Sequence, residues 1–192
     1  GVGVRAQAGE KTGFAYSNDL HLQALTQAAG AARSIARSGQ QGSVQAWQRS
    51  SALPLYSAEN PLDSMAQTDK VAFLQRLDAY TRSLDPRVTQ VSISLGGVHD
   101  TVLVAASDGT WAGDVRPLVR LNISVIIEHN GRRERGSFGG GGRTDYRFFE
   151  AEERGMAYAR EAVRQAVVNL DAIAAPAGSM PVVMGPGWSG VL

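Results

Sequence analysis

The segment from residue 115 to residue 129 constrains the fold most, because its side chains alternate between apolar and polar. Alternation with a period of two is typical of a β-strand that buries one face and exposes the other. The apolar face would contain Val115, Val119, Leu121, Ile123, Val125 and Ile127. Asn130-Gly131 follows, and this pair favours a two-residue hairpin because both residues tolerate positive φ. Such a hairpin would place Glu128 opposite Arg133 as a favourable charge pair.

More strands are predicted on either side of this segment. Val91, Ile93 and Leu95 alternate with polar residues, Gly96-Gly97 predicts a bend, and an apolar run from 101 to 106 ends at an Asp108-Gly109 turn. Together these signals predict a four-stranded antiparallel meander from residue 87 to residue 138. The first sixteen residues predict a separate hairpin, with Gly9-Glu10-Lys11 as its turn.

Three segments have apolar residues at helical spacing. The first would be capped by Asn18 or Asp19, end at Ser38-Gly39, and bury Leu22, Leu25, Ala28, Ala29, Ala32, Ile35 and Ala36. The second would be capped by Thr68, end at Asp85-Pro86, and bury Val71, Leu74, Leu77 and Leu84. The third would run from 145 to 171, with Glu152 interrupting a stripe of Phe149, Met156, Ala159, Val163, Ala166 and Leu170.

These elements predict an α+β fold in which an antiparallel β-sheet meander packs with about three helices in two layers. Residues 40–61 lack periodicity and predict a long surface connection that Trp47, Leu53, Leu55 and Tyr56 hold in place. The 192 residues, 43% of them hydrophobic, suffice for one core with room for an attached subdomain.

Composition argues against several classes of function. Cysteine is absent, which excludes disulfides and thiolate chemistry and is compatible with the cytoplasm. No apolar run approaches the roughly 18 residues of a membrane span. The net charge is +1, and acidic residues interleave with the arginines between 132 and 147, so nucleic acid is disfavoured as a partner.

Neither a metal site nor a catalytic residue is predicted within the chain. His21, His99 and His129 stand far apart and form no His-x-x-x-His pattern. Glu150, Glu152 and Glu153 could suggest an acid and base pair, but neighbouring helix residues point in different directions. Acidic groups near a helix start also complement the helix dipole.

Residues 136–143 contain four consecutive glycines, which expose backbone amides and carbonyls. Bare backbone suits the close approach of a phosphate or of an extended peptide that adds as a strand. The segment lacks the Lys-Ser/Thr ending of a phosphate-binding loop. A flexible hinge or linker is therefore favoured over a nucleotide site.

The sequence resembles the TldD/PmbA family in segments spread over nearly the whole chain. The matching segments are residues 1–6, 9–16, 114–121, 132–136, 139–143 and 174–178. The resemblance implies a cytoplasmic, zinc-dependent metallopeptidase that cleaves unfolded or small peptides. It also implies a complex with a paralogous PmbA (TldE) subunit or a self-dimer, and an older label as a modulator of DNA gyrase.

The resemblance also predicts which parts of the family this chain contains. In that family the histidines of a His-Glu-x-x-x-His helix hold the zinc and the glutamate is the base for its bound water. No residue here matches that motif, so the zinc ligands are expected outside this chain, and the chain alone is expected to be inactive. Residues 1–175 are expected to form the N-terminal domain without its first segment. Residues 176–192 would begin the connection into a C-terminal metallopeptidase domain.

Two roles remain open for this part of the protein. In the first, it shapes substrate access and assembly, and an extended peptide approaches the backbone at Gly139, Gly140, Gly141, Gly142 and Arg143. In the second, it is a structural or dimerisation scaffold that does not touch substrate.

Overall fold

The computed structural model describes residues 1–36, 45–49, 55–183 and 185. The chain forms two compact units, Gly1–Ser50 with Val104–Ala112 and Ser51–Leu103 with Gly113–Leu192. Helices and mostly antiparallel strands make up both, so the predicted α+β class is confirmed. No helix in the described part of the chain is both long and apolar enough to cross a bilayer.

The first unit contains the predicted N-terminal hairpin, formed by β1 (Val2–Ala8) and β2 (Lys11–Ser17). Ala8 pairs with Lys11 across the turn, where Gly9 has φ of 61°. Helix α1 (Leu22–Ala36) contacts both strands. A side chain at Gly13 would overlap the backbone of Ala32, so glycine permits this close packing.

The prediction for the buried face of α1 included residues that the structure shows to be exposed. Ala28, Ala32 and Ala36 are buried, whereas Leu22 is 78% exposed and Ile35 is 59% exposed. Ala29 is exposed as well. A close contact with a two-stranded hairpin has room only for a narrow stripe of small side chains. The predicted helix end at Ser38-Gly39 lies outside the described residues.

The connection after α1 contributes a strand that periodicity did not predict. Strand β3 (Gln48–Arg49) pairs in parallel with Thr110 and Trp111 of β5 (Thr110–His129). The Trp47 and Trp111 rings lie 5.0 Å apart between centroids. Trp47 Nε1 donates a hydrogen bond to the Ala106 carbonyl at 3.1 Å. Leu53 lies outside the described residues.

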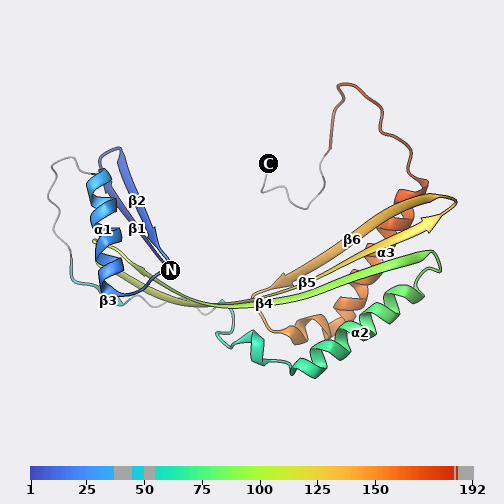
Figure 1. Ribbon diagram of the computed structural model, residues 1–192, viewed down its shortest axis with the longest axis horizontal. Coiled ribbons are helices and arrows are strands. Elements are labelled where there is room, and N and C mark those ends of the chain that lie inside the picture. The colour runs from blue at the N-terminus through green and yellow to red at the C-terminus, as the bar shows by residue number, and fades with distance from the viewer. Residues whose placement is uncertain (37–44, 50–54, 184, 186–192) are drawn as a thin grey trace. The chain divides into compact units, whose positions relative to one another are not determined.

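The second unit packs two helices on one face of a sheet (Figure 1). In this sheet β5 pairs with both β4 (Val88–Ala105) and β6 (Arg132–Gly142). Helices α2 (Gln67–Ser83) and α3 (Arg154–Asp171) contact each other, and α3 also lies against β6. The predicted apolar face of β5 forms the centre of the core, where Val119, Leu121, Ile123, Val125 and Ile127 are at most 1% exposed.

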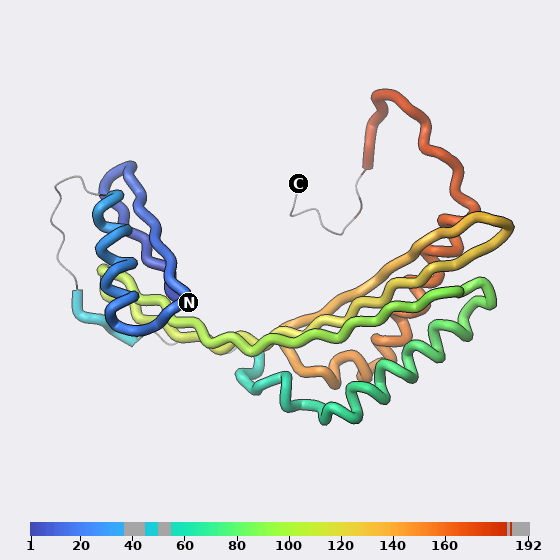
Figure 2. Tube along the Cα trace, in the orientation of Figure 1, coloured from blue at the N-terminus to red at the C-terminus, as the bar shows by residue number. Residues whose placement is uncertain are grey.

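Figure 2 shows the tight hairpin that joins β5 to β6. It turns at Asn130 and Gly131, whose φ angles are 50° and 78°. Glu128 pairs with Arg133 in register, and Arg133 Nε lies 3.1 Å from Glu128 Oε1. The sequence prediction of this turn and its charge pair is confirmed.

The expected four-stranded meander contains three strands instead. Strand β4 continues through Gly96-Gly97 without a break, so the predicted bend there was wrong. A side chain at Gly97 would overlap the Tyr146 hydroxyl group, so this glycine makes room for packing and does not turn the chain. The fourth strand of the sheet is β3, which is parallel to β5.

Helices α2 and α3 begin at other residues than predicted. Ala66 occupies the N-cap of α2 without a side-chain hydrogen bond, and Thr68 lies in the first turn. Val71 is 45% exposed, while Phe73, Leu77 and Thr81 form the buried face.

Before α3, the short 3₁₀ helices η2 (Tyr146–Phe149) and η3 (Ala151–Glu153) replace the predicted first turns. The stripe from Ala159 to Leu170 is buried as predicted, but Glu152 is exposed and lies outside α3.

Candidate functional site

The glycine-rich segment is the second half of strand β6. Gly139 pairs with Asn122, Gly140 with Leu121, and Gly142 with Val119. The Asn-Gly turn fixes this register, and the pairing continues along the full length of β6. The interpretation as a flexible hinge or linker was therefore wrong.

Most of these glycines have a steric reason to be glycine. A side chain at Gly136 would overlap the backbone of α3 at Ala162, and one at Gly140 would overlap the Tyr158 hydroxyl group. A side chain at Gly141 would overlap the Val119 carbonyl. Gly142 differs, because an added Cβ would meet only Thr144 Cγ2, at 3.8 Å.

Strand β6 has one edge without a partner strand among the described residues, since its only pairing there is with β5. An unpaired edge presents backbone amides and carbonyls that can pair with another extended chain. Gly141 is exposed and Gly139, Gly140 and Gly142 are half-buried. The edge could therefore accept an extended peptide near Gly142.

Arg143 follows the strand and joins a polar cluster. Its guanidinium lies 5.3 Å from the centroid of the Tyr56 ring, and its Nη1 donates to the Pro117 carbonyl at 3.4 Å. Tyr56 Oη donates to Asp114 Oδ2 at 2.7 Å, and Arg116 Nε donates to the same oxygen at 2.6 Å. We call Tyr56, Asp114, Arg116 and Arg143 the arginine-tyrosine cluster.

The hydrogen bonds of this cluster set its charge. Those from Arg116 and then Tyr56 lower the pKa of Asp114, and the bond to Asp114 raises the pKa of the Tyr56 hydroxyl. At neutral pH the aspartate is therefore ionised and the tyrosine is protonated. Two arginines against one aspartate leave a net charge of +1. Such a cluster can bind and orient a carbonyl or carboxylate.

The sequence predicts a substrate contact at Arg143 but does not place Tyr56, Asp114 and Arg116 in a site. The Asp114-x-Arg116 spacing was a usable signal, because residues two apart in a strand lie on the same face. No local pattern connects Tyr56 with Asp114, which is 58 residues away in the chain.

The three histidines do not come together in a metal site. His21 Nε2 lies 3.5 Å from Asp19 Oδ1, and His99 Nε2 lies 3.3 Å from the Ala58 carbonyl. His129 is the last residue of β5. Within the described ranges, no three His, Cys, Asp or Glu side chains are grouped so that they could hold a metal ion. These residues do not fit a zinc site.

Comparison with known proteins relates both parts of the chain to one family. Residues 1–36 match the PmbA/TldA metallopeptidase domain 1, and residues 60–170 match the PmbA/TldA metallopeptidase central domain. A protein of Haemophilus influenzae named metalloprotease TldD homolog is 50% identical over the whole chain. A protein of the same name from Buchnera aphidicola (subspecies Acyrthosiphon pisum) is 42% identical.

The matched relatives are longer than this chain, which spans 41% of the length of each. A crystal structure from Bacteroides thetaiotaomicron, described as a candidate modulator of DNA gyrase, superposes with a TM-score of 0.63 at 13% identity. That superposition covers 86% of this chain and 38% of the other. It shows a shared fold.

Proposed function

The chain belongs to the PmbA/TldD metallopeptidase family, and from this premise we propose that it is the non-catalytic part of a peptidase subunit. The complete subunit would use zinc to cleave unfolded or small peptides in the cytoplasm, in a complex of TldD with PmbA (TldE) or as a self-dimer. The identity of 50% to the Haemophilus influenzae protein, over an alignment that covers the whole chain, carries this proposal. The zinc ligands would be residues outside this chain.

Within the subunit, we assign this part to substrate access. The free edge of β6 at Gly139, Gly140, Gly141 and Gly142 would pair with an extended peptide, and Arg143 would contact a peptide carbonyl. Gly142 supports this assignment, because no neighbouring atom requires a glycine there. An unfolded peptide offers the unpaired backbone that such an edge needs.

Gly142→Val in the full-length protein tests this assignment. The added side chain has space in the fold but would hinder a peptide at the strand edge, so peptide hydrolysis should fall about tenfold or more. Gly96→Val is the matched control, because Gly96 is also a strand glycine with nothing within 4 Å of an added Cβ. Metal content and molecular mass in solution should stay unchanged in both variants.

The second role is a scaffold that does not touch substrate. Gly136, Gly140 and Gly141 favour it, because packing alone explains these glycines. If Gly142→Val and Gly96→Val hydrolyse peptides at the same rate as the unmodified protein, substrate contact at β6 is refuted and the scaffold role stands.

A further inference from the structure

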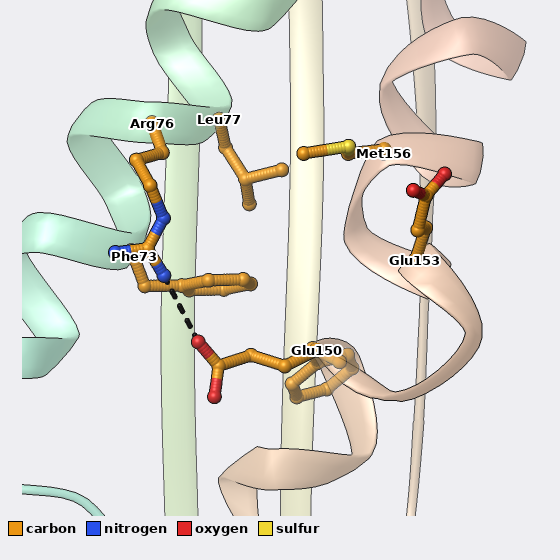
Figure 3. A pocket seen from close by; sticks show the side chains of 7 residues that line it. Phe73, Arg76, Leu77, Glu150, Glu153 and Met156 are labelled. Atoms are coloured by element: carbon orange, nitrogen blue, oxygen red, sulfur yellow. Dashed lines mark hydrogen bonds and ion pairs between the residues drawn. The ribbon is translucent and has the colours of Figure 1, made fainter.

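A pocket of about 190 Å³ lies between α2 and the start of α3 (Figure 3). Phe73, Leu77, Phe149 and Met156 provide its apolar walls, and Arg76, Glu150 and Glu153 provide its polar groups. A cavity of about 150 Å³ lined by apolar side chains is enough to bind benzene. The pocket can therefore hold one side chain of the size of leucine or phenylalanine.

The polar groups of the pocket leave one carboxylate without a partner. Arg76 Nη2 lies 2.9 Å from Glu150 Oε1, so these two charges neutralise each other (Figure 3). The Glu153 carboxylate makes no hydrogen bond or ion pair with any other residue in the described part of the chain. Figure 3 shows Glu153 on the α3 side of the pocket, the side from which Met156 also extends. The pocket thus combines an apolar interior with one uncompensated negative charge.

The backbone at this carboxylate is strained. Glu152 and Glu153 have φ of 52° and 51°, in the left-handed region that costs a non-glycine residue about 1–2 kcal/mol. Glycine would occupy both positions without this cost. Glu152 has an ion pair with Arg154 at 2.7 Å, but nothing comparable offsets the strain at Glu153. Strained residues of this kind cluster at functional sites, and Glu153 is exposed, so its carboxylate is accessible to a ligand from outside the chain.

We propose that this pocket binds the amino-terminal residue of a peptide. Its large apolar side chain would lie among Phe73, Leu77 and Met156, and its α-ammonium would pair with Glu153. A peptide amino terminus carries a cation one bond away from the carbon that bears the side chain, so both groups can enter one small pocket. The proposal does not depend on the peptidase activity, because its test measures binding alone.

The test uses the full-length protein with ¹³C-methyl methionine and three small probes. Phenylalaninamide has both groups, N-acetyl-phenylalaninamide lacks the cation, and glycinamide lacks the apolar group. At about pH 6 a free α-amino group, with a pKa of about 7.7–8.0, is protonated. Phenylalaninamide should shift the Met156 methyl signal, which Met156→Leu identifies by its loss. The other two probes should bind at least about tenfold more weakly.

Two matched glycine variants separate the carboxylate from the strain. Glu153→Gly and Glu152→Gly both relieve a left-handed residue, so neither should lower the melting temperature. Only Glu153→Gly should weaken phenylalaninamide binding, by about tenfold. Equal affinity in both variants, or equal binding of the acetylated probe, would overturn the proposal. Glu153→Gln keeps the side-chain shape and repeats the test if Glu153→Gly does not fold.

Discussion

At the scale of single residues, Asp85 fixes the passage from α2 into β4. Its Oδ1 accepts hydrogen bonds from the Arg87 backbone amide and from Arg87 Nε, both at 2.9 Å, and its Oδ2 accepts one from Arg87 Nη2 at 2.6 Å. These bonds lower the pKa of Asp85. The ion pair between Asp85 and Arg87 thus stabilises the backbone on both sides of Pro86, the residue that prevents the helix from continuing.

Asp85→Asn should lower the free energy of unfolding by about 1 kcal/mol at neutral pH, because the ion pair is lost. The native pKa lies below the usual value of about 3.9, so the pair stabilises the fold above that pH. This stabilisation is lost as the pH falls through the lowered native pKa. Urea unfolding should therefore show the two proteins converging in stability at acid pH. A difference that stays constant with pH would contradict this account.

At the scale of elements, Gly136 sets the distance between β6 and α3. An added Cβ would overlap the backbone of α3 at Ala162 and Ala166, which cannot move as a flexible side chain can. Gly136→Ala should lower the free energy of unfolding by about 3 kcal/mol, as expected for an overfilled core. Gly96→Ala is the control, because its Cβ would meet nothing within 4 Å, and it should leave stability unchanged or slightly raised. Equal denaturation midpoints for Gly136→Ala and Gly96→Ala would show that α3 does not pack this closely against β6.

Elements with a strong local pattern were predictable from sequence, and those set by contacts were not. The alternation of apolar and polar residues predicted β5 and its buried face, and Asn130-Gly131 predicted the turn. Both features depend on residues that are adjacent in the sequence. The start of α3 was misplaced, because no rule of sequence predicts two glutamates in the left-handed region. The glycines of β6 suggested a hinge, because their partners Tyr158 and Val119 are known only from the fold.

At the scale of the whole molecule, the sequence indicated the family but not the grouping of the site. Short segments spread along the chain resemble the PmbA/TldD family, and the family match confirms this prediction. The α+β class was predicted from the periodicity of the apolar residues. The arginine-tyrosine cluster joins residues from distant parts of the chain, so only the folded second unit reveals it. The domain boundary expected near residue 175 stays a prediction.

The distribution of histidines leads to a prediction for the chain as a whole. His21 precedes α1 in the first unit, while His99 on β4 and His129 on β5 belong to the second, and no three potential ligands group together among the described residues. The purified 192-residue chain should therefore retain no stoichiometric zinc after dialysis and should not hydrolyse unfolded peptides. Elemental analysis and a peptide cleavage assay measure both, with the full-length protein as the positive control. Tight zinc binding or turnover by the chain alone would show that its residues form a metal centre. The proposal that this chain is the non-catalytic part of the subunit would then be wrong.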